Sequence, residues 1–151
     1  MWNKDKSLFL SVVIVKICYV LLAGCCIAAP WIVKGYDNGY IVAAGLPSLY
    51  VPLMITLYCA VPPAGAALFC LDRLLGNIHR GEPFIKQNVT LLRVISYCCF
   101  GEALIFVYFA TQRYFAALVV VAFAFMGLIL RVVKNVFQQA VEMREENDFT
   151  I

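Results

Sequence analysis

Two charged residues inside long apolar segments are the side chains best placed to do chemistry. Lys16 interrupts the apolar run 8–33, and Glu102 interrupts the run 94–111. An isolated charge in membrane hydrocarbon is costly, so such residues pair, lose their charge or line a path for ions. If both runs cross a membrane in the same direction, the two side chains lie near its middle and can meet. Two interpretations stay open: a static ion pair that fixes helix register, and a proton or cation relay gated by protonation of Glu102.

Other reactive residue types form no recognisable centre. All seven cysteines lie in or beside apolar runs rather than in polar loops, so they do not form a disulfide framework. Adjacent cysteines are too closely spaced for an ordinary zinc site, and the apolar runs hold no histidine. There is no nucleophile with a base partner, no carboxylate pair and no phosphate loop. We therefore expect no enzyme activity, no metal and no cofactor.

The composition excludes a soluble globular protein. Of the 151 residues, 64% are hydrophobic and 14% are charged, and the mean hydropathy is +0.87. Soluble domains are about 45–50% apolar and about 25% charged. A chain this short cannot bury so much apolar surface in its own core, so the excess must face lipid. The net charge of +3 is too small to indicate direct binding of nucleic acid.

Four apolar segments are long enough to cross a membrane, which takes about 20 helical residues. We predict an all-α polytopic membrane protein, one domain over 1–151, with spans at about 8–30, 50–71, 92–111 and 114–134. Continuous apolar runs without alternation favour helices over strands. After the last span, apolar residues recur at helical spacing from Val133 to Val141, which predicts a cytoplasmic helical tail over 135–151.

The basic residues predict the orientation of these spans. The amino terminus, the second connection and the carboxyl end together hold nine Lys and Arg, whereas the other two connections hold only Lys34 and Arg113. Cytoplasmic segments carry the excess of Lys and Arg. We therefore expect both termini in the cytoplasm.

Proline and glycine mark the places where helices bend or end. Pro62 and Pro63 lie inside the second span, where missing N–H groups predict either a hinge or a static kink. Gly81 and Pro83 should end the helix that contains this span. The next helix should begin near Phe84 or near Asn88, with Asn88 as a cap. The first apolar run contains Leu22-Ala23-Gly24-Cys25, which looks like the cleavage site of a lipoprotein signal, but Lys16 interrupts the apolar region that such a signal needs. We expect that segment to be retained.

Two motifs resemble a known family. One is Leu74-Leu75-Gly76-Asn77-Ile78 with Gly81-Glu82-Pro83-Phe84, Asn88 and Leu92-Arg93, and the other is Val136-Phe137 with the ending Val141–Ile151. With the four-span layout, they resemble, over essentially the whole chain, a bacterial family of membrane proteins catalogued as domain of unknown function 2975. The resemblance implies a multi-pass protein of the bacterial cytoplasmic (inner) membrane. The genes of this family commonly lie beside the gene for a small helix-turn-helix regulator of the Cro/CI type, which implies a regulatory partner.

Two classes of function follow. The first is a non-enzymatic signalling protein whose loop and tail bind a cytosolic helix-turn-helix regulator. Its other expected partners are membrane lipid and further copies of the same chain, and it does not bind nucleic acid directly. The residues expected to bind this partner are Gly81, Pro83, Phe84, Asn88, Arg93, Phe137, Glu145, Glu146 and Asp148. The alternative is a small transporter or proton-coupled channel using Lys16 and Glu102, or an accessory subunit of a larger transporter.

Overall fold

The chain folds into long helices. The computed structural model describes residues 4–148, which form helix α1 (Lys4–Tyr36), a π-helix η1 (Asp37–Val42), α2 (Tyr50–His79), α3 (Lys86–Ala110) and α4 (Ala116–Asp148). Each of the four α-helical regions is long and apolar enough to cross a membrane. The expected all-α class, with four helices long and apolar enough to span a membrane, is confirmed for the described part of the chain.

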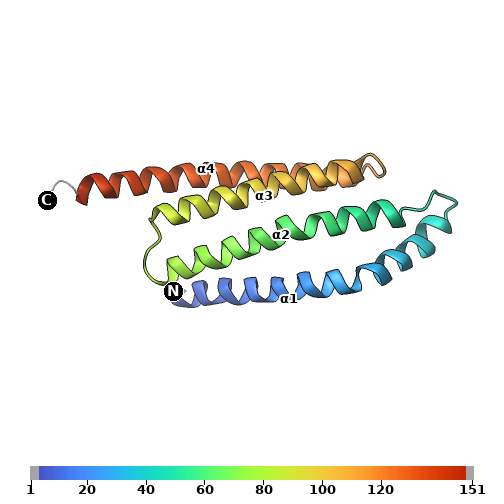
Figure 1. Cartoon of the computed structure of the whole chain (residues 1–151), viewed down its shortest axis with the longest axis horizontal. Helices are drawn as coiled ribbons and strands as arrows, with labels where there is room; N and C mark the ends of the chain where they lie inside the picture. The colour runs from blue at the N-terminus through green and yellow to red at the C-terminus, as the bar shows by residue number, and fades with distance from the viewer. Residues whose placement is uncertain (1–3, 149–151) are drawn as a thin grey trace.

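The helices form an antiparallel row in chain order (Figure 1). The most extensive interface joins α3 to α4, followed by α2 with α3 and then α1 with α2. Helix α3 is also the most buried, with 33% of its span inside the protein against 11% for each of the others. Because α1 packs against α2 and not against α3, it lies at the edge of the row. The broad faces that remain are those that lipid must cover.

A glycine lets α3 and α4 approach closely. A Cβ atom added to Gly127 of α4 would lie only 3.1 Å from the nearest carbons of the Phe100 ring on α3. Beside this contact, the buried Ser96 hydroxyl donates a 2.8 Å hydrogen bond to the Gly127 carbonyl. Small residues and hydroxyl bonds are the usual means of holding helices together in lipid. This contact therefore fixes the register of α4 on α3.

Helix α1 continues further than the sequence predicts. The first span was expected over about 8–30, but α1 continues through Pro30 to Tyr36 and then joins η1. Pro30 has no N–H to offer the Cys26 carbonyl four residues earlier. The Tyr58 hydroxyl of α2 donates a 3.2 Å hydrogen bond to that carbonyl instead. Helix α1 curves in this second half (Figure 1), and α2 compensates for the proline across the interface.

The start of α2 depends on a buried carboxylate. Asp37 is 5% exposed and accepts hydrogen bonds from the Ser48 hydroxyl at 2.5 Å and from the Leu49 N–H at 2.7 Å. Leu49 is the cap residue of α2, so a side chain from η1 satisfies a donor at the entrance of the next helix. The irregular part of this connection is therefore confined to residues 43–49.

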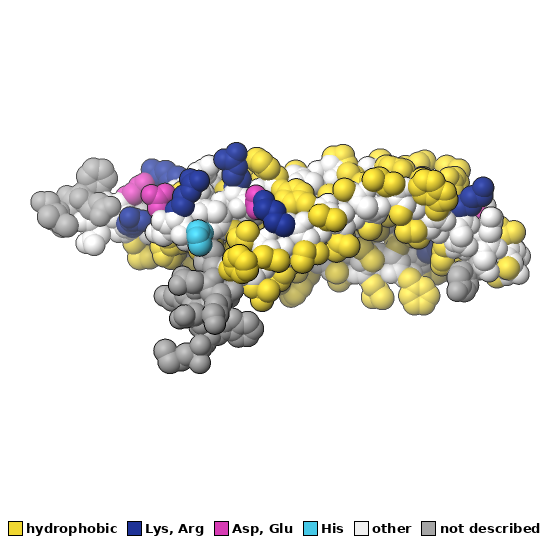
Figure 2. Space-filling view, turned by 90° about the horizontal axis from the view of Figure 1, so that it is seen from below, with side chains coloured by type: hydrophobic (Ala, Val, Ile, Leu, Met, Phe, Trp, Pro, Cys, Tyr) yellow, Lys and Arg dark blue, Asp and Glu magenta, His cyan; other side chains and the backbone are white. Residues whose placement is uncertain are grey.

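The opposite end of the row carries the α2–α3 connection, the start of α1 and the end of α4. Helix α4 projects beyond the other helices there (Figure 1). Its continuous helix from Ala116 to Asp148 includes most of the expected tail 135–151. Charged side chains gather toward this end, and hydrophobic side chains cover much of the remaining face in view (Figure 2).

Candidate functional site

The contact between Lys16 and Glu102 that the span directions allow is not formed. Lys16 Nζ lies 3.1 Å from the Asp72 carboxylate of α2. The two side chains are 62% and 31% exposed, so this ion pair is an accessible one. The two side chains do not meet because the helices that carry them are not neighbours in the row. Asp72 was missed because the second span was ended one residue before it.

Glu102 lies in the most buried helix and has no ion-pair partner among the described residues. It is 5% exposed, and neither carboxyl oxygen has a hydrogen bond with a described residue. The backbone of Ala64 faces it from α2, immediately after the Pro62-Pro63 pair. A buried carboxyl without a hydrogen-bond partner is costly in any protein interior. Of the two expected intramembrane residues, only Glu102 is buried.

The α2–α3 connection is held by one buried side chain. Asn88 is 0% exposed; its Oδ1 accepts a 2.7 Å hydrogen bond from the Asn77 amide. Its own amide nitrogen donates to the carbonyls of Glu82, at 3.1 Å, and Pro83, at 2.8 Å. Asn88 was expected to cap a helix, but α3 begins earlier, at Lys86, and its cap residue Ile85 makes no side-chain cap bond. Asn88 instead bonds back across the turn.

Gly81 completes this turn. Its φ of +80° lies in the left-handed region, where a side chain would be strained. The Gly81 N–H donates a 3.0 Å hydrogen bond to the Ile78 carbonyl, which closes the end of α2. The expectation that Gly81 breaks the helix is therefore confirmed, and its position calls for glycine on structural grounds alone.

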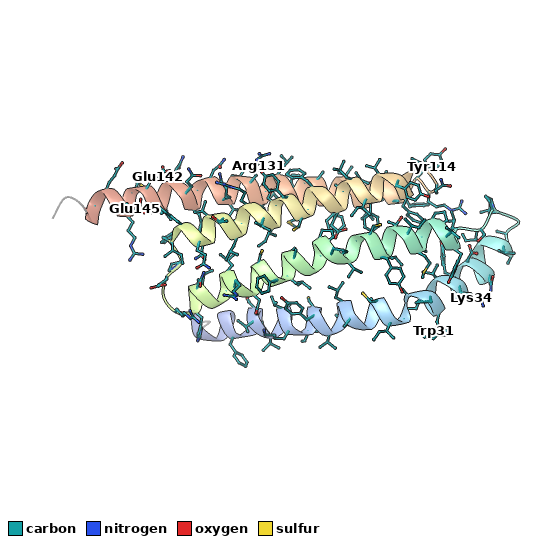
Figure 3. All side chains as sticks on the ribbon, in the orientation of Figure 1. Trp31, Lys34, Tyr114, Arg131, Glu142 and Glu145 are labelled. Carbon is teal, nitrogen blue, oxygen red and sulfur yellow. The ribbon has the colours of Figure 1, made fainter. Side chains whose placement is uncertain are left out.

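The loop and the end of α4, distant in sequence, meet in space. The rings of Phe84 and Phe137 are 5.5 Å apart, and Lys86 Nζ lies 2.8 Å from the Glu145 carboxylate. Glu142 and Glu145 lie on the stretch of α4 that extends past the loop (Figure 3). A shallow hollow of about 370 Å³ opens between the two segments. We call its lining the loop–tail surface: Glu82, Phe84, Ile85, Lys86, Val141, Arg144 and Glu145.

The remaining expected partner-binding residues divide into separate groups. Pro83 is partly buried and accepts the Asn88 bond, so it belongs to the turn. Glu146 is exposed on α4, whereas the side chain of Asp148 lies outside the described residues. Arg93 does not line the hollow and instead faces α4 beside Arg131 and Lys134. The described residues contain no cluster of metal-ligating side chains.

Comparison with known proteins identifies the family of the chain. A family profile described as protein of unknown function, DUF2975, matches residues 42–151. The chain belongs to the DUF2975 family. No curated protein and no solved structure matches it at a significant level.

The DUF2975 match includes both halves of the loop–tail surface, which confirms the resemblance seen in the loop and tail motifs. It begins at residue 42, so α1 with Lys16 lies outside the matched part. The resemblance therefore covers less of the chain than expected. Within the match, Asn77, Gly81 and Asn88 build the turn, and the ion pair and ring contact join that turn to α4.

Proposed function

We propose that this DUF2975 protein is a non-enzymatic regulatory protein of the bacterial inner membrane. In this proposal both termini and the loop–tail surface face the cytoplasm, and the surface holds a soluble helix-turn-helix regulator at the membrane. The observation that carries the proposal is that two sequence motifs, far apart in the chain, meet at one end through Phe84 with Phe137 and Lys86 with Glu145.

The charge distribution supports the cytoplasmic orientation. Nine of the Lys and Arg residues belong to segments at the end of the row that carries the loop, against two at the other end. Positively charged segments stay on the cytoplasmic side during insertion. Trp31, Lys34 and Tyr114 lie at the opposite end (Figure 3), where aromatic side chains suit a membrane boundary.

The composition of the surface supports a protein partner with a basic face. Phe84 on the surface is 42% exposed, and Met143, on α4 beside the surface, is 63% exposed. Apolar side chains therefore stand among polar ones, as at a protein interface. The exposed carboxylates of Glu142 and Glu146 lie on the same helix. Acidic side chains steer a basic partner by complementary charge, and DNA-binding proteins carry such basic faces.

The test is recovery of the partner from native membranes. We expect the full chain to co-purify with a small DNA-binding protein that mass spectrometry identifies, and we expect Glu142→Lys with Glu146→Lys to lose it. Lys34→Glu, a charge reversal at the opposite end, is the control and should retain the partner. Recovery of the same proteins with all three chains would contradict docking at this end. Reporter transcription unchanged by the double variant would contradict the regulatory role.

A second candidate function rests on Glu102. Its carboxyl is buried in α3 without an ion-pair partner among the described residues, and the Ala64 backbone faces it. Ionisable residues inside membrane spans commonly serve ion or proton movement. The alternative is therefore a proton-coupled channel or transporter, or a subunit of one. In proteoliposomes, Glu102→Gln should abolish flux while Asp72→Asn, which alters an accessible carboxylate, should leave it intact. Flux unaffected by Glu102→Gln would remove this candidate.

A further inference from the structure

Three basic side chains converge on one polar hollow between α3 and α4. Arg93 comes from α3, and Arg131 and Lys134 come from α4; Ser96 and Tyr97 complete the lining. The hollow measures about 40 Å³, whereas a water molecule needs about 10–15 Å³ of such space. It therefore has room for one compact polar group of a few atoms, and not for a large ligand.

No described residue forms an ion pair with the basic groups of this hollow, and Glu142 lines a neighbouring hollow with Arg93. No acidic residue is among the lining side chains. Neither Arg93 nor Arg131 makes an ion pair or hydrogen bond with a described residue, and Lys134 Nζ donates only to the neutral Gln138 side chain, at 3.1 Å. Like charges held together at the edge of a low-dielectric medium repel one another. An anionic group between them would relieve this repulsion.

The depth of the hollow matches the level of lipid phosphates. Arg131 directly follows the apolar run 115–130, and Arg93 directly precedes the run 94–111. At about 1.5 Å per residue, Arg131 lies about 22 Å along α4 from Ala116. The hydrocarbon core of a membrane is about 30 Å thick, and the long arginine side chain can extend the remaining distance to its cytoplasmic face. Arg131 lies inward of Glu142 and Glu145 (Figure 3). The hollow is thus at the membrane boundary, below the loop–tail surface.

The protein holds the two helices that carry these side chains in a fixed register. Ser96 is 3% exposed and its hydroxyl bonds to the Gly127 carbonyl at 2.8 Å, one turn before Arg131. Phe100 packs on Gly127 at the same level. The basic groups are therefore positioned by a packed interface rather than by flexible surface loops. Tyr97 is exposed beside them, as aromatic residues at headgroup level commonly are.

We propose that this hollow binds the phosphate group of an anionic membrane phospholipid. The two guanidinium groups offer paired N–H donors that match phosphate oxygens, and Lys134 adds a third positive charge. The acyl chains of the lipid lie along the apolar faces of α3 and α4. Basic pockets between spans on the cytoplasmic side suit anionic headgroups. The site is independent of the proposed protein partner, because it lies beside the loop–tail surface and not in it.

The test compares retained lipids. The full chain is reconstituted in equal amounts of phosphatidylglycerol and phosphatidylcholine, extracted in mild detergent, and its bound lipids are counted by native mass spectrometry. We expect enrichment of phosphatidylglycerol that falls about tenfold in Arg131→Gln and in Arg93→Gln, since each removes a charge-assisted contact. Arg80→Gln removes one exposed charge at the same end and should keep the enrichment.

Three results would overturn the proposal. One is an equal loss of enrichment in Arg80→Gln, which would indicate diffuse attraction rather than a site. A second is the absence of phosphatidylglycerol enrichment in the parent chain. The third is thermal stabilisation by inorganic phosphate, in phosphatidylcholine alone, as large as that by phosphatidylglycerol, which would indicate a soluble anion. Arg131→Lys keeps the positive charge without the paired guanidinium donors. Its phosphatidylglycerol enrichment should lie between those of the parent chain and Arg131→Gln, which would show that the loss in Arg131→Gln is not a folding defect.

Discussion

The side-chain amide of Asn77 donates a 2.7 Å hydrogen bond to Oδ1 of Asn88, and this contact joins the end of α2 to the start of α3. Asn88 also donates to two carbonyls of the intervening turn. One fully buried side chain thus closes the turn from which Phe84 and Lys86 reach α4. The geometry of the loop–tail surface depends on this pair.

Removing the Asn88 side chain should destabilise the protein strongly. Asn88→Ala loses three partly buried hydrogen bonds and leaves a gap at a fully buried position, which costs about 2–4 kcal/mol. Asn77→Ala removes one of them and should cost about 1 kcal/mol. Thermal and denaturant unfolding in detergent measure both. Asn38→Ala, exposed at the opposite end, is the control, and an Asn88→Ala protein as stable as this control would contradict the clamp.

Asp37 should control the first turn of α2. Asp37→Ala removes the acceptor for both Ser48 and the Leu49 N–H, and loss of such a capping group costs about 1–2 kcal/mol. Ser48→Ala removes only one of these bonds and should have the smaller effect. Amide hydrogen exchange at residues 49–53 measures the change locally. Exchange that stays as slow in Asp37→Ala as in the parent chain would show that the carboxylate does not stabilise this turn.

Gly127 should be sensitive to a single added methyl group. In Gly127→Ala the new Cβ would lie 3.1 Å from carbons of the Phe100 ring, and overpacking of this kind costs about 1–3 kcal/mol. Gly101→Ala, on α3 beside Phe100, meets nothing within 4 Å and should be neutral or stabilising by up to about 1 kcal/mol. The midpoint of thermal unfolding compares the two.

A smaller residue opposite Gly127 should rescue the substitution. If the clash with Phe100 is the cause, Phe100→Leu combined with Gly127→Ala should be more stable than the sum of the single changes predicts. Strict additivity would place the cause of the destabilisation elsewhere.

The bond from Tyr58 to the Cys26 carbonyl should matter only because Pro30 is present. Tyr58→Phe removes the 3.2 Å hydrogen bond and should cost about 0.6–1.7 kcal/mol, the range for hydrogen bonds between helices in membranes. In a Pro30→Ala background the carbonyl regains a backbone donor, so Tyr58→Phe should cost little. A double-mutant cycle in unfolding free energy measures this coupling. Equal costs in both backgrounds would refute it, and Tyr97→Phe is the control for loss of an exposed hydroxyl.

The number and type of the helices could be predicted because lipid leaves a backbone few choices. Runs of about 20 apolar residues must satisfy their own hydrogen bonds, which favours helix whatever the neighbours. Helix ends were harder to predict. Pro30 was not expected inside a helix that continues to Tyr36, because the donor that replaces its N–H is Tyr58 on another helix.

Residue pairs within the site could not be predicted for a related reason. The direction of the spans allowed Lys16 to meet Glu102, but the packing order of the helices gave it Asp72. The turn formed by Gly81 and Pro83 is local and was predicted. Its contact with Phe137 and Glu145 depends on the register of α4 against α3, which the fit of Phe100 onto Gly127 determines.

The bond between Tyr58 and the Cys26 carbonyl also has a consequence for biosynthesis. Helix α1 is made first, and until α2 follows, the carbonyl freed by Pro30 has no donor. Hydrocarbon offers none, and a bare carbonyl there costs several kcal/mol. We therefore expect the nascent first helix to wait at the protein-conducting channel and to enter the bilayer together with the second, as a hairpin. Site-specific crosslinking of stalled chains, with and without Tyr58→Phe, would reveal how long it waits.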